Sequence, residues 1–78
     1  MKIRITKPDG DIYQGDARFL LLPGVDGLFE ILNSHAPIIA ALSAGTIRLV
    51  EENNEEHRFD ILGGVVKGEH NDILILVQ

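Results

Sequence analysis

The residues that could do chemistry in this 78-residue chain are few and far apart. None of its histidines, at positions 35, 57 and 70, has a partner at the H-x-H or H-x-x-x-H spacing of metal sites, which need three or four converging ligands. Ser34 and Ser43 lie outside any G-x-S-x-G elbow, and Ser34 does not form the usual nucleophile–base pair with His35 merely by adjacency. Cysteine is absent, so thiolate ligands and thiol nucleophiles are excluded. We therefore expect no catalytic and no metal-binding residues.

The remaining polar clusters have simple structural explanations. The acids at positions 51, 52, 55 and 56 surround two asparagines, in a pattern that is typical of a solvated hairpin tip rather than of paired catalytic carboxylates in a cleft. The glycines at positions 24, 27, 63 and 64 match neither a dinucleotide-binding fingerprint nor a phosphate-binding loop. We expect no bound cofactor.

Charge and composition exclude further classes of function. The formal net charge of −5 repels phosphate backbones, and four aromatic residues are too few for a stacking platform, so we expect no nucleic-acid partner. The longest apolar runs, FLLLP and IIAAL, are too short to cross a bilayer, and the opening MKIRITKPDG lacks the apolar core of a signal peptide. We expect no direct insertion into a membrane.

Short apolar runs alternate with turn residues along the whole chain. KIRIT alternates strictly before the turn KPDGD, IYQ is predicted to end at Gly15, and TIRLVEE and EHRFDIL flank the two asparagines as a hairpin. IIAAL, at 38–42, is predicted to be a strand or a brief helical turn. No segment shows a sustained helical period. The pattern predicts one all-β domain over residues 1–78, a two-sheet sandwich or flattened barrel of about eight to ten short strands.

Alternation within the strands predicts more apolar faces than one thin sandwich can bury. If Phe29 and Ile31 point inward, Glu30 points outward together with the leucines on either side of this trio. If Ala17 and Phe19 point inward, the even-numbered leucines of the same strand point outward. The surplus side chains are Leu20, Leu22, Leu28, Leu32, Leu74 and Leu76. Loops or a neighbouring edge could cover them, or they could form contacts with other proteins.

His35 lies in a stiff segment, His35-Ala36-Pro37. Pro37 fixes its own φ and pushes Ala36 towards extended geometry, so the histidine is presented from a restrained loop. Two interpretations remain open from these residues alone. The histidine could bond its own backbone in a structural loop, or it could anchor an interface.

PGVDGLFEILNSHAP, followed by LSAGTIRLVEE, closely resembles the N-terminal β-sandwich domain of the epsilon subunit of F-type ATP synthases. The family pattern LPGxxGxFGILPxHAPxxxxLxxGxI is matched at three of its four glycines and at its HAP segment, and a glycine pair lies before the last two strands. The matched structural positions are Gly24, Gly27, Ala36, Pro37, Gly45, Gly63 and Gly64. The resemblance covers essentially the whole chain.

Two departures from the family pattern stand out. Glu30 and Asn33 occupy positions where the family usually has glycine and proline. Typical members also continue into a two-helix C-terminal domain that restrains ATP hydrolysis in many of them and binds ATP in some, whereas this sequence ends at Gln78. We therefore expect neither nucleotide binding nor an inhibitory arm in this chain.

The resemblance implies a non-catalytic rotor subunit in the central stalk. Such a domain lies between the gamma subunit and the polar loops of the membrane c-ring, and it helps couple proton flow to ATP synthesis. By the same resemblance, Asp26, Leu28, Glu30 and His35 map to the c-ring contact edge, where acids could complement an arginine of the ring loops. The expected location is peripheral, on the cytoplasmic face of the bacterial plasma membrane.

A small carrier domain of the lipoyl or biotinyl type is the alternative from another class. It is also small, acidic and all-β, but it displays a modified lysine at a hairpin tip. Only Lys2, Lys7 and Lys67 are present, and none has the methionine or aspartate neighbours that such a site uses. A generic β-sandwich enzyme is disfavoured by the missing catalytic residues.

Overall fold

Turn residues divide the chain into eight strands, and the computed structural model describes every residue from 1 to 78. The predicted all-β class is confirmed, and no helix is present. The strands are β1 (Lys2–Lys7), β2 (Gly10–Gly24), β3 (Gly27–Leu32), β4 (Ile38–Leu42), β5 (Gly45–Glu51), β6 (Glu56–Ile61), β7 (Gly64–Glu69) and β8 (Asp72–Val77). The segment IIAAL is therefore a strand and not a helical turn.

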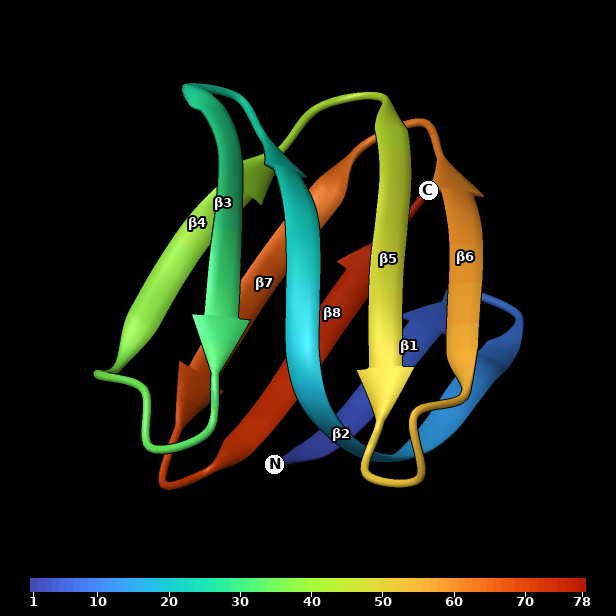
Figure 1. Ribbon diagram of the computed structural model, residues 1–78. Helices are drawn as coiled ribbons and strands as arrows, with labels where there is room; N and C mark the ends of the chain where they lie inside the picture. The colour runs from blue at the N-terminus through green and yellow to red at the C-terminus, as the bar shows by residue number, and fades with distance from the viewer.

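The strands form two layers that share one long strand (Figure 1). One layer has the order β3-β2-β5-β6, and the other has the order β4-β7-β8-β1. The N-terminal half of β2 pairs with β1, while its C-terminal half pairs with β3 and β5, so β2 passes from one layer to the other. All neighbouring strands are antiparallel except β1 and β8, which run parallel. The two layers bury aliphatic faces against each other, as in a sandwich.

Strand β2 contains the one clear error of the face predictions. It continues through Gly15 without a break, and its register against β5 shifts between Ala17 and Phe19. This bulge adds one residue to β2 and inverts the alternation, because side chains on either side of it no longer follow a single period of two. Leu20 and Leu22 are consequently fully buried, and the prediction that they point outward is wrong. They are core residues and are not available for a contact with another protein.

The other strands follow simple alternation. Leu28 and Leu32 are 71% and 52% exposed, while Ile31 between them is buried, as predicted for β3. In β8, Leu76 is 50% exposed and Leu74 is half-buried. The core that remains is aliphatic, and its fully buried side chains include Ile3, Ile5, Leu20, Leu22, Ile47, Leu49, Val66 and Ile75.

Two-residue turns join several of these strands. Pro8 and Asp9 connect β1 to β2, and Val25 and Asp26 connect β2 to β3. His70 and Asn71 connect β7 to β8 with φ angles of 50° and 65°, the conformation of a type I′ turn, whose twist matches the flanking strands. The structure contains no helix that is long and apolar enough to cross a membrane.

Candidate protein-binding surfaces

Three of the four residues predicted for a contact edge lie together at one end of the sandwich. Asp26 is exposed in the β2–β3 turn, and Leu28 and Glu30 point outward from β3. They border a groove of about 700 Å³ between the free edges of β3 and β4. Val25 and Ile39, which are 59% and 73% exposed, enlarge its apolar part. We call this surface, with its two acids and no basic residue, the acidic edge.

The family resemblance implied that His35 is the fourth residue of the contact edge, but His35 does not line the groove of the acidic edge. Its ring is half-buried, its Nδ1 lies 2.8 Å from the carbonyl oxygen of Ala36, and its Nε2 is buried without a hydrogen-bond partner. The ring packs on Gly68 of β7, where a methyl group would lie only 3.1 Å from the imidazole Cε1 atom. A glycine inside a strand signals such a close approach, so Gly68 was the overlooked sequence signal. The geometry favours the structural interpretation of His35 over the interface anchor.

Asn33, one of the two departures from the family pattern, has a definite contact. Its Oδ1 atom accepts a hydrogen bond of 2.9 Å from the amino group of Met1, which also donates to the Ala17 carbonyl oxygen. Proline has no side-chain acceptor and could not make this bond. The departure therefore fastens the β3–β4 loop to the start of the chain.

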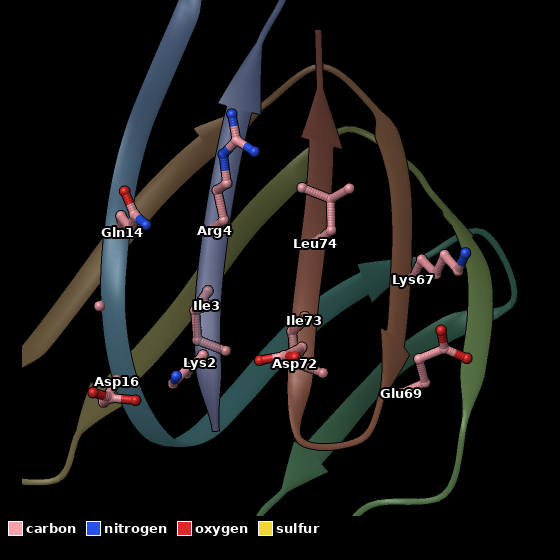
Figure 2. Close-up of a pocket in the computed structure, with 11 residues that line it drawn as sticks. Lys2, Ile3, Arg4, Gln14, Asp16, Lys67, Glu69, Asp72, Ile73 and Leu74 are labelled. Carbon is pink, nitrogen blue, oxygen red and sulfur yellow. The ribbon is translucent and has the colours of Figure 1, made fainter.

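The outer face of the β4-β7-β8-β1 layer carries the last two of the predicted interface leucines, Leu74 and Leu76. Leu74 lies in a shallow hollow of about 600 Å³, between Arg4 of β1 and Lys67 of β7 (Figure 2). Three basic residues line this hollow together with three acidic ones: Lys2, Arg4, Lys67, Asp16, Glu69 and Asp72. Because these charges balance, the hollow has no preference for an anion or a cation. Lys2 and Lys67 lie within strands, and Lys7 ends β1 beside the Pro8–Asp9 turn.

A hydrogen-bonded cluster closes the side of the sandwich where β2 and β6 approach. Glu51 Oε2 accepts a 2.8 Å bond from the Tyr13 hydroxyl and lies 2.8 Å from His57 Nε2. The rings of Tyr13, His57 and Phe59 pack together, with the Tyr13 centroid 5.2 Å from His57 and 5.6 Å from Phe59. The hydrogen bond from Tyr13 lowers the pKa of Glu51, and the bond with His57 lowers it further by a smaller amount. The cluster ties the two layers together.

The same cluster contains three atoms that could ligate a cation. Donor atoms of Glu51, Glu55 and His57 lie within 4.8 Å of one another. Glu51 Oε2 is already bonded to Tyr13 and lies against His57 Nε2, and the three residues are partly or fully exposed to water. We therefore interpret the cluster as a structural tie. No signal in the sequence pointed to it, because Tyr13 and Glu51 are 38 positions apart.

Titration of Tyr13 tests this tie directly, because Tyr13 is the only tyrosine. Burial, the bond to Glu51 and the charge of that carboxylate raise the pKa of Tyr13 from 10.0 to about 12. We expect the tyrosinate absorbance of the native protein to rise near pH 12 and Glu51→Gln to move this midpoint towards 10. Because the pKa is higher in the folded state, the stabilisation is complete below pH 10 and is lost as pH rises towards 12. A native midpoint near 10, or an equal shift in Glu52→Gln, would contradict the tie.

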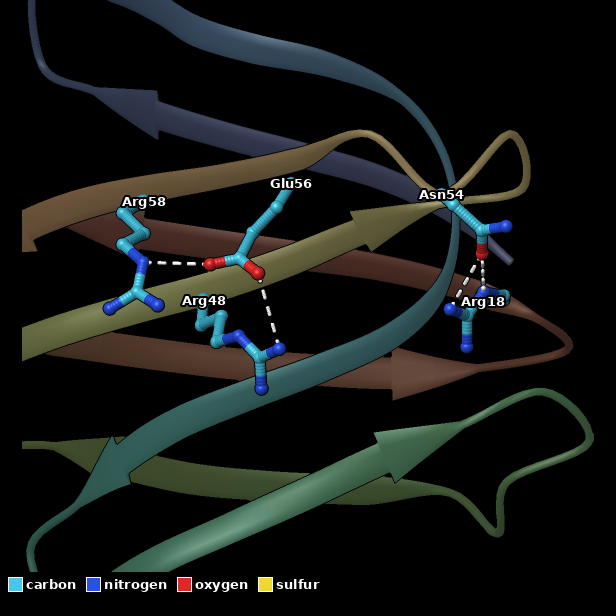
Figure 3. Close-up of polar contacts among 5 residues, drawn as sticks. All are labelled: Arg18, Arg48, Asn54, Glu56 and Arg58. Atoms are coloured by element: carbon cyan, nitrogen blue, oxygen red, sulfur yellow. Dashed lines mark hydrogen bonds and ion pairs between the residues drawn. The ribbon is translucent and has the colours of Figure 1, made fainter.

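A second polar network lies on the outer face of the β3-β2-β5-β6 layer (Figure 3). Glu56 accepts a 2.8 Å bond from Arg58 Nε and pairs with Arg48 Nη2 at 3.1 Å. Hydrogen bonds from these two guanidinium groups lower the pKa of the Glu56 carboxyl, and the bond from Arg48 has the larger effect. Arg18 instead donates two bonds to the Asn54 side chain in the β5–β6 turn. The Arg48 guanidinium also lies 5.4 Å from the centre of the Phe19 ring.

Two of the glycines that match the family pattern allow close packing in the β3-β2-β5-β6 layer. A methyl group on Gly45 would come within 2.8 Å of the Pro23 side chain, and one on Gly24 within 2.8 Å of the Phe29 ring. Ala36 and Pro37 belong to the loop that carries His35. The Ser43 hydroxyl donates to the Pro23 carbonyl oxygen and not to a base. The site residues are therefore suited to contact and packing.

Comparison with known proteins gives a consistent result. The family model described as "ATP synthase, Delta/Epsilon chain, beta-sandwich domain" matches residues 1–78. The chain is 41% identical to the ATP synthase epsilon chain of Helicobacter acinonychis, covering 95% of this chain and 61% of that protein. It is 35% identical to the epsilon chain of Chlorobium limicola, covering 99% of this chain and 88% of that protein. The chain thus spans somewhat under two thirds of the first relative and most of the second.

Two solved structures share the fold. A chain in the mitochondrial ATP synthase of Euglena gracilis superimposes with a TM-score of 0.90 at 18% identity, covering 96% of this chain and 48% of that one. A chain in the central stalk and c-ring structure of Tetrahymena thermophila mitochondrial ATP synthase gives 0.82 at 19% identity, covering 100% and 63% respectively. At these identities the likeness establishes the sandwich fold.

Proposed function

Because this chain belongs to the delta/epsilon chain β-sandwich family of ATP synthases, we propose that it is a non-catalytic rotor subunit of the central stalk of an F-type ATP synthase. The observation that carries the proposal is the match of the family model to residues 1–78, the entire chain. In this role the domain links the gamma subunit to the c-ring and helps couple proton flow to ATP synthesis. It is held on the cytoplasmic face of the bacterial plasma membrane through these partners.

The acidic edge is the surface that we assign to the c-ring. It combines exposed apolar area on Leu28 with the carboxylates of Asp26 and Glu30, and no basic residue lies in its groove. A cationic loop on the ring would find opposite charge and apolar contact in the same place. Complementary charge of this kind mainly sets the association rate and the orientation of the partners. His35 contributes by fixing the loop next to this edge.

Binding to purified gamma subunit and to purified c-ring tests the proposal. We expect the wild-type chain to bind gamma and, with gamma present, the ring. Asp26→Lys with Glu30→Lys should weaken ring binding by about tenfold at low salt, and the difference should shrink as salt screens the charges. The matched control is Asp9→Lys with Glu52→Lys, which makes the same charge change in exposed turns elsewhere.

The outcomes separate the two parts of the proposal. Failure of the wild-type chain to bind gamma would remove the rotor function. Binding of gamma with equal ring affinity in the acidic-edge variant and its control would leave the rotor function standing and would show that the ring contacts another surface.

A further inference from the structure

Met1 holds its amino group against the sandwich instead of extending it into water. The residue is only 4% exposed, and its side chain belongs to the aliphatic core. Its nitrogen donates to the Ala17 carbonyl oxygen at 3.0 Å and to Asn33 Oδ1 at 2.9 Å. The N mark and the β3–β4 loop lie at the same end of the sandwich in Figure 1. A backbone acceptor and a side-chain acceptor therefore converge on one amino group.

These two bonds make different demands on the Met1 nitrogen. The bond to Ala17 completes a backbone pair, because the Ala17 N–H donates back to the Met1 carbonyl oxygen at 2.9 Å. An ordinary amide N–H could make that bond. The bond to Asn33 needs a second hydrogen on the same nitrogen, and an ammonium group has three hydrogens whereas an amide nitrogen has one. Bonding to both acceptors therefore requires a free amino group.

The loop that contains Asn33 has few anchors. Its bond from Met1 is the only side-chain hydrogen bond between residues 33–37 and another segment of the chain. Ser34 follows with a φ of 63°, a conformation that residues other than glycine rarely adopt and that persists only where neighbouring contacts hold it. The Asn33 bond holds the chain before Ser34, and the packing of His35 on Gly68 holds it after.

The tie between Met1 and Asn33 is a property of this sequence rather than of the family pattern. The family usually has proline at position 33, and proline offers no side-chain acceptor to an amino group. The tie also lies close to the acidic edge along the chain. Strand β3, which carries Leu28 and Glu30, ends at Leu32 immediately before Asn33.

From these observations we infer that the Met1 amino group is a modification-sensitive site, which the fold accepts as a free amine and which a small acyl group such as formyl or acetyl disables. An acylated nitrogen keeps one N–H, so it retains the bond to Ala17 but loses the bond to Asn33 and the positive charge. The β3–β4 loop then loses one of its two anchors. Loosening this loop weakens the contact of the acidic edge with the c-ring, a step that rests on the proposed function.

Amide hydrogen exchange of the full 78-residue chain tests the inference. The chain is prepared by chemical synthesis with either a free or an acetylated amino end. We expect acetylation to speed exchange at residues 31–36 by about tenfold or more, because a hydrogen bond to a charged group is lost. Asn33→Ala with a free amino end should show the same acceleration, and acetylating that variant should add little. A recombinant chain with Gly-Ser ahead of Met1 should behave like the acetylated chain, because its Met1 nitrogen is an amide.

Asn53→Ala is the matched control. Asn53 is also an exposed turn asparagine whose side chain accepts one hydrogen bond, from the Glu55 N–H. Its substitution should leave exchange at residues 31–36 unchanged and keep the full response to acetylation. Equal exchange in the free and acetylated wild-type chains would show that the inference is wrong. An undiminished response to acetylation in Asn33→Ala would assign the effect to another contact and would also overturn it.

Binding to purified c-ring in the presence of gamma tests the second step. We expect the acetylated chain and Asn33→Ala to bind the ring about threefold to tenfold more weakly, because a loosened loop must be ordered again on binding. If exchange responds but ring affinity does not, the step from the loop to the ring is wrong. If the free wild-type chain binds no ring at all, the proposed function fails, while the exchange rates still decide the inference about Met1.

Discussion

Leu20→Ala is expected to lower the free energy of unfolding by about 3 to 5 kcal/mol, whereas Leu21→Ala should cost about 1 kcal/mol or less. Leu20 is fully buried between the layers, and Leu21, its neighbour in β2, is half-buried on the outer face. Truncating the first side chain leaves a cavity in the aliphatic core, which relaxes only in part. A domain of this length has on the order of 4 to 12 kcal/mol in total, so Leu20→Ala removes a large share of it.

Urea denaturation of the two variants beside the wild-type chain measures this difference. The midpoints should separate clearly while the slopes stay alike, because both variants expose a similar surface on unfolding. The pair also tests the bulge between Ala17 and Phe19. A larger loss for Leu21→Ala than for Leu20→Ala would show that β2 alternates without this bulge.

Gly64→Ala is also expected to be strongly damaging, with a loss of about 3 kcal/mol of unfolding free energy. A methyl group on Gly64 would overlap the backbone carbonyl of Leu76, which belongs to the neighbouring strand β8 and cannot rotate away as a side chain could. The overlap pushes β7 and β8 apart where Gly64 pairs with Val77. Native-state hydrogen exchange should show lost protection in both strands.

Val65→Ala is the control for this prediction. Val65 is the next residue in β7 and is 42% exposed, so its truncation changes the same strand without steric overlap and should cost well under about 1 kcal/mol. Similar losses for the two variants would mean that the close approach at Gly64 is relieved by small backbone shifts.

Local sequence signals were sufficient where a strand or turn is specified by its own residues. The turn KPDG and the asparagine-containing β5–β6 connection are where the prediction put them, and β3 alternates as expected. The bulge in β2 was not predictable, because it depends on how β2 pairs with β5, whose residues come about 30 positions later. The inverted faces of Leu20 and Leu22 follow from that one long-range feature.

The candidate site was predictable to a similar degree. Asp26, Leu28 and Glu30 come from one hairpin. Alternation predicted that Leu28 and Glu30 point outward, and the family resemblance implied that all three share a contact edge. Ile39 joins them only because β4 lies across the groove from β3, which is a property of the whole topology.

The position of β8 has a consequence for how the protein is made. This strand lies in the middle of its layer, between β1 and β7, and it is the only parallel partner of β1. A nascent chain can assemble β2, β3, β5 and β6 early, but β1 waits for residues 72–77 before its second edge is paired. Pairings of such long sequence separation form slowly. We therefore expect the pairing of β1 with β8 to be a late step in the folding of this domain.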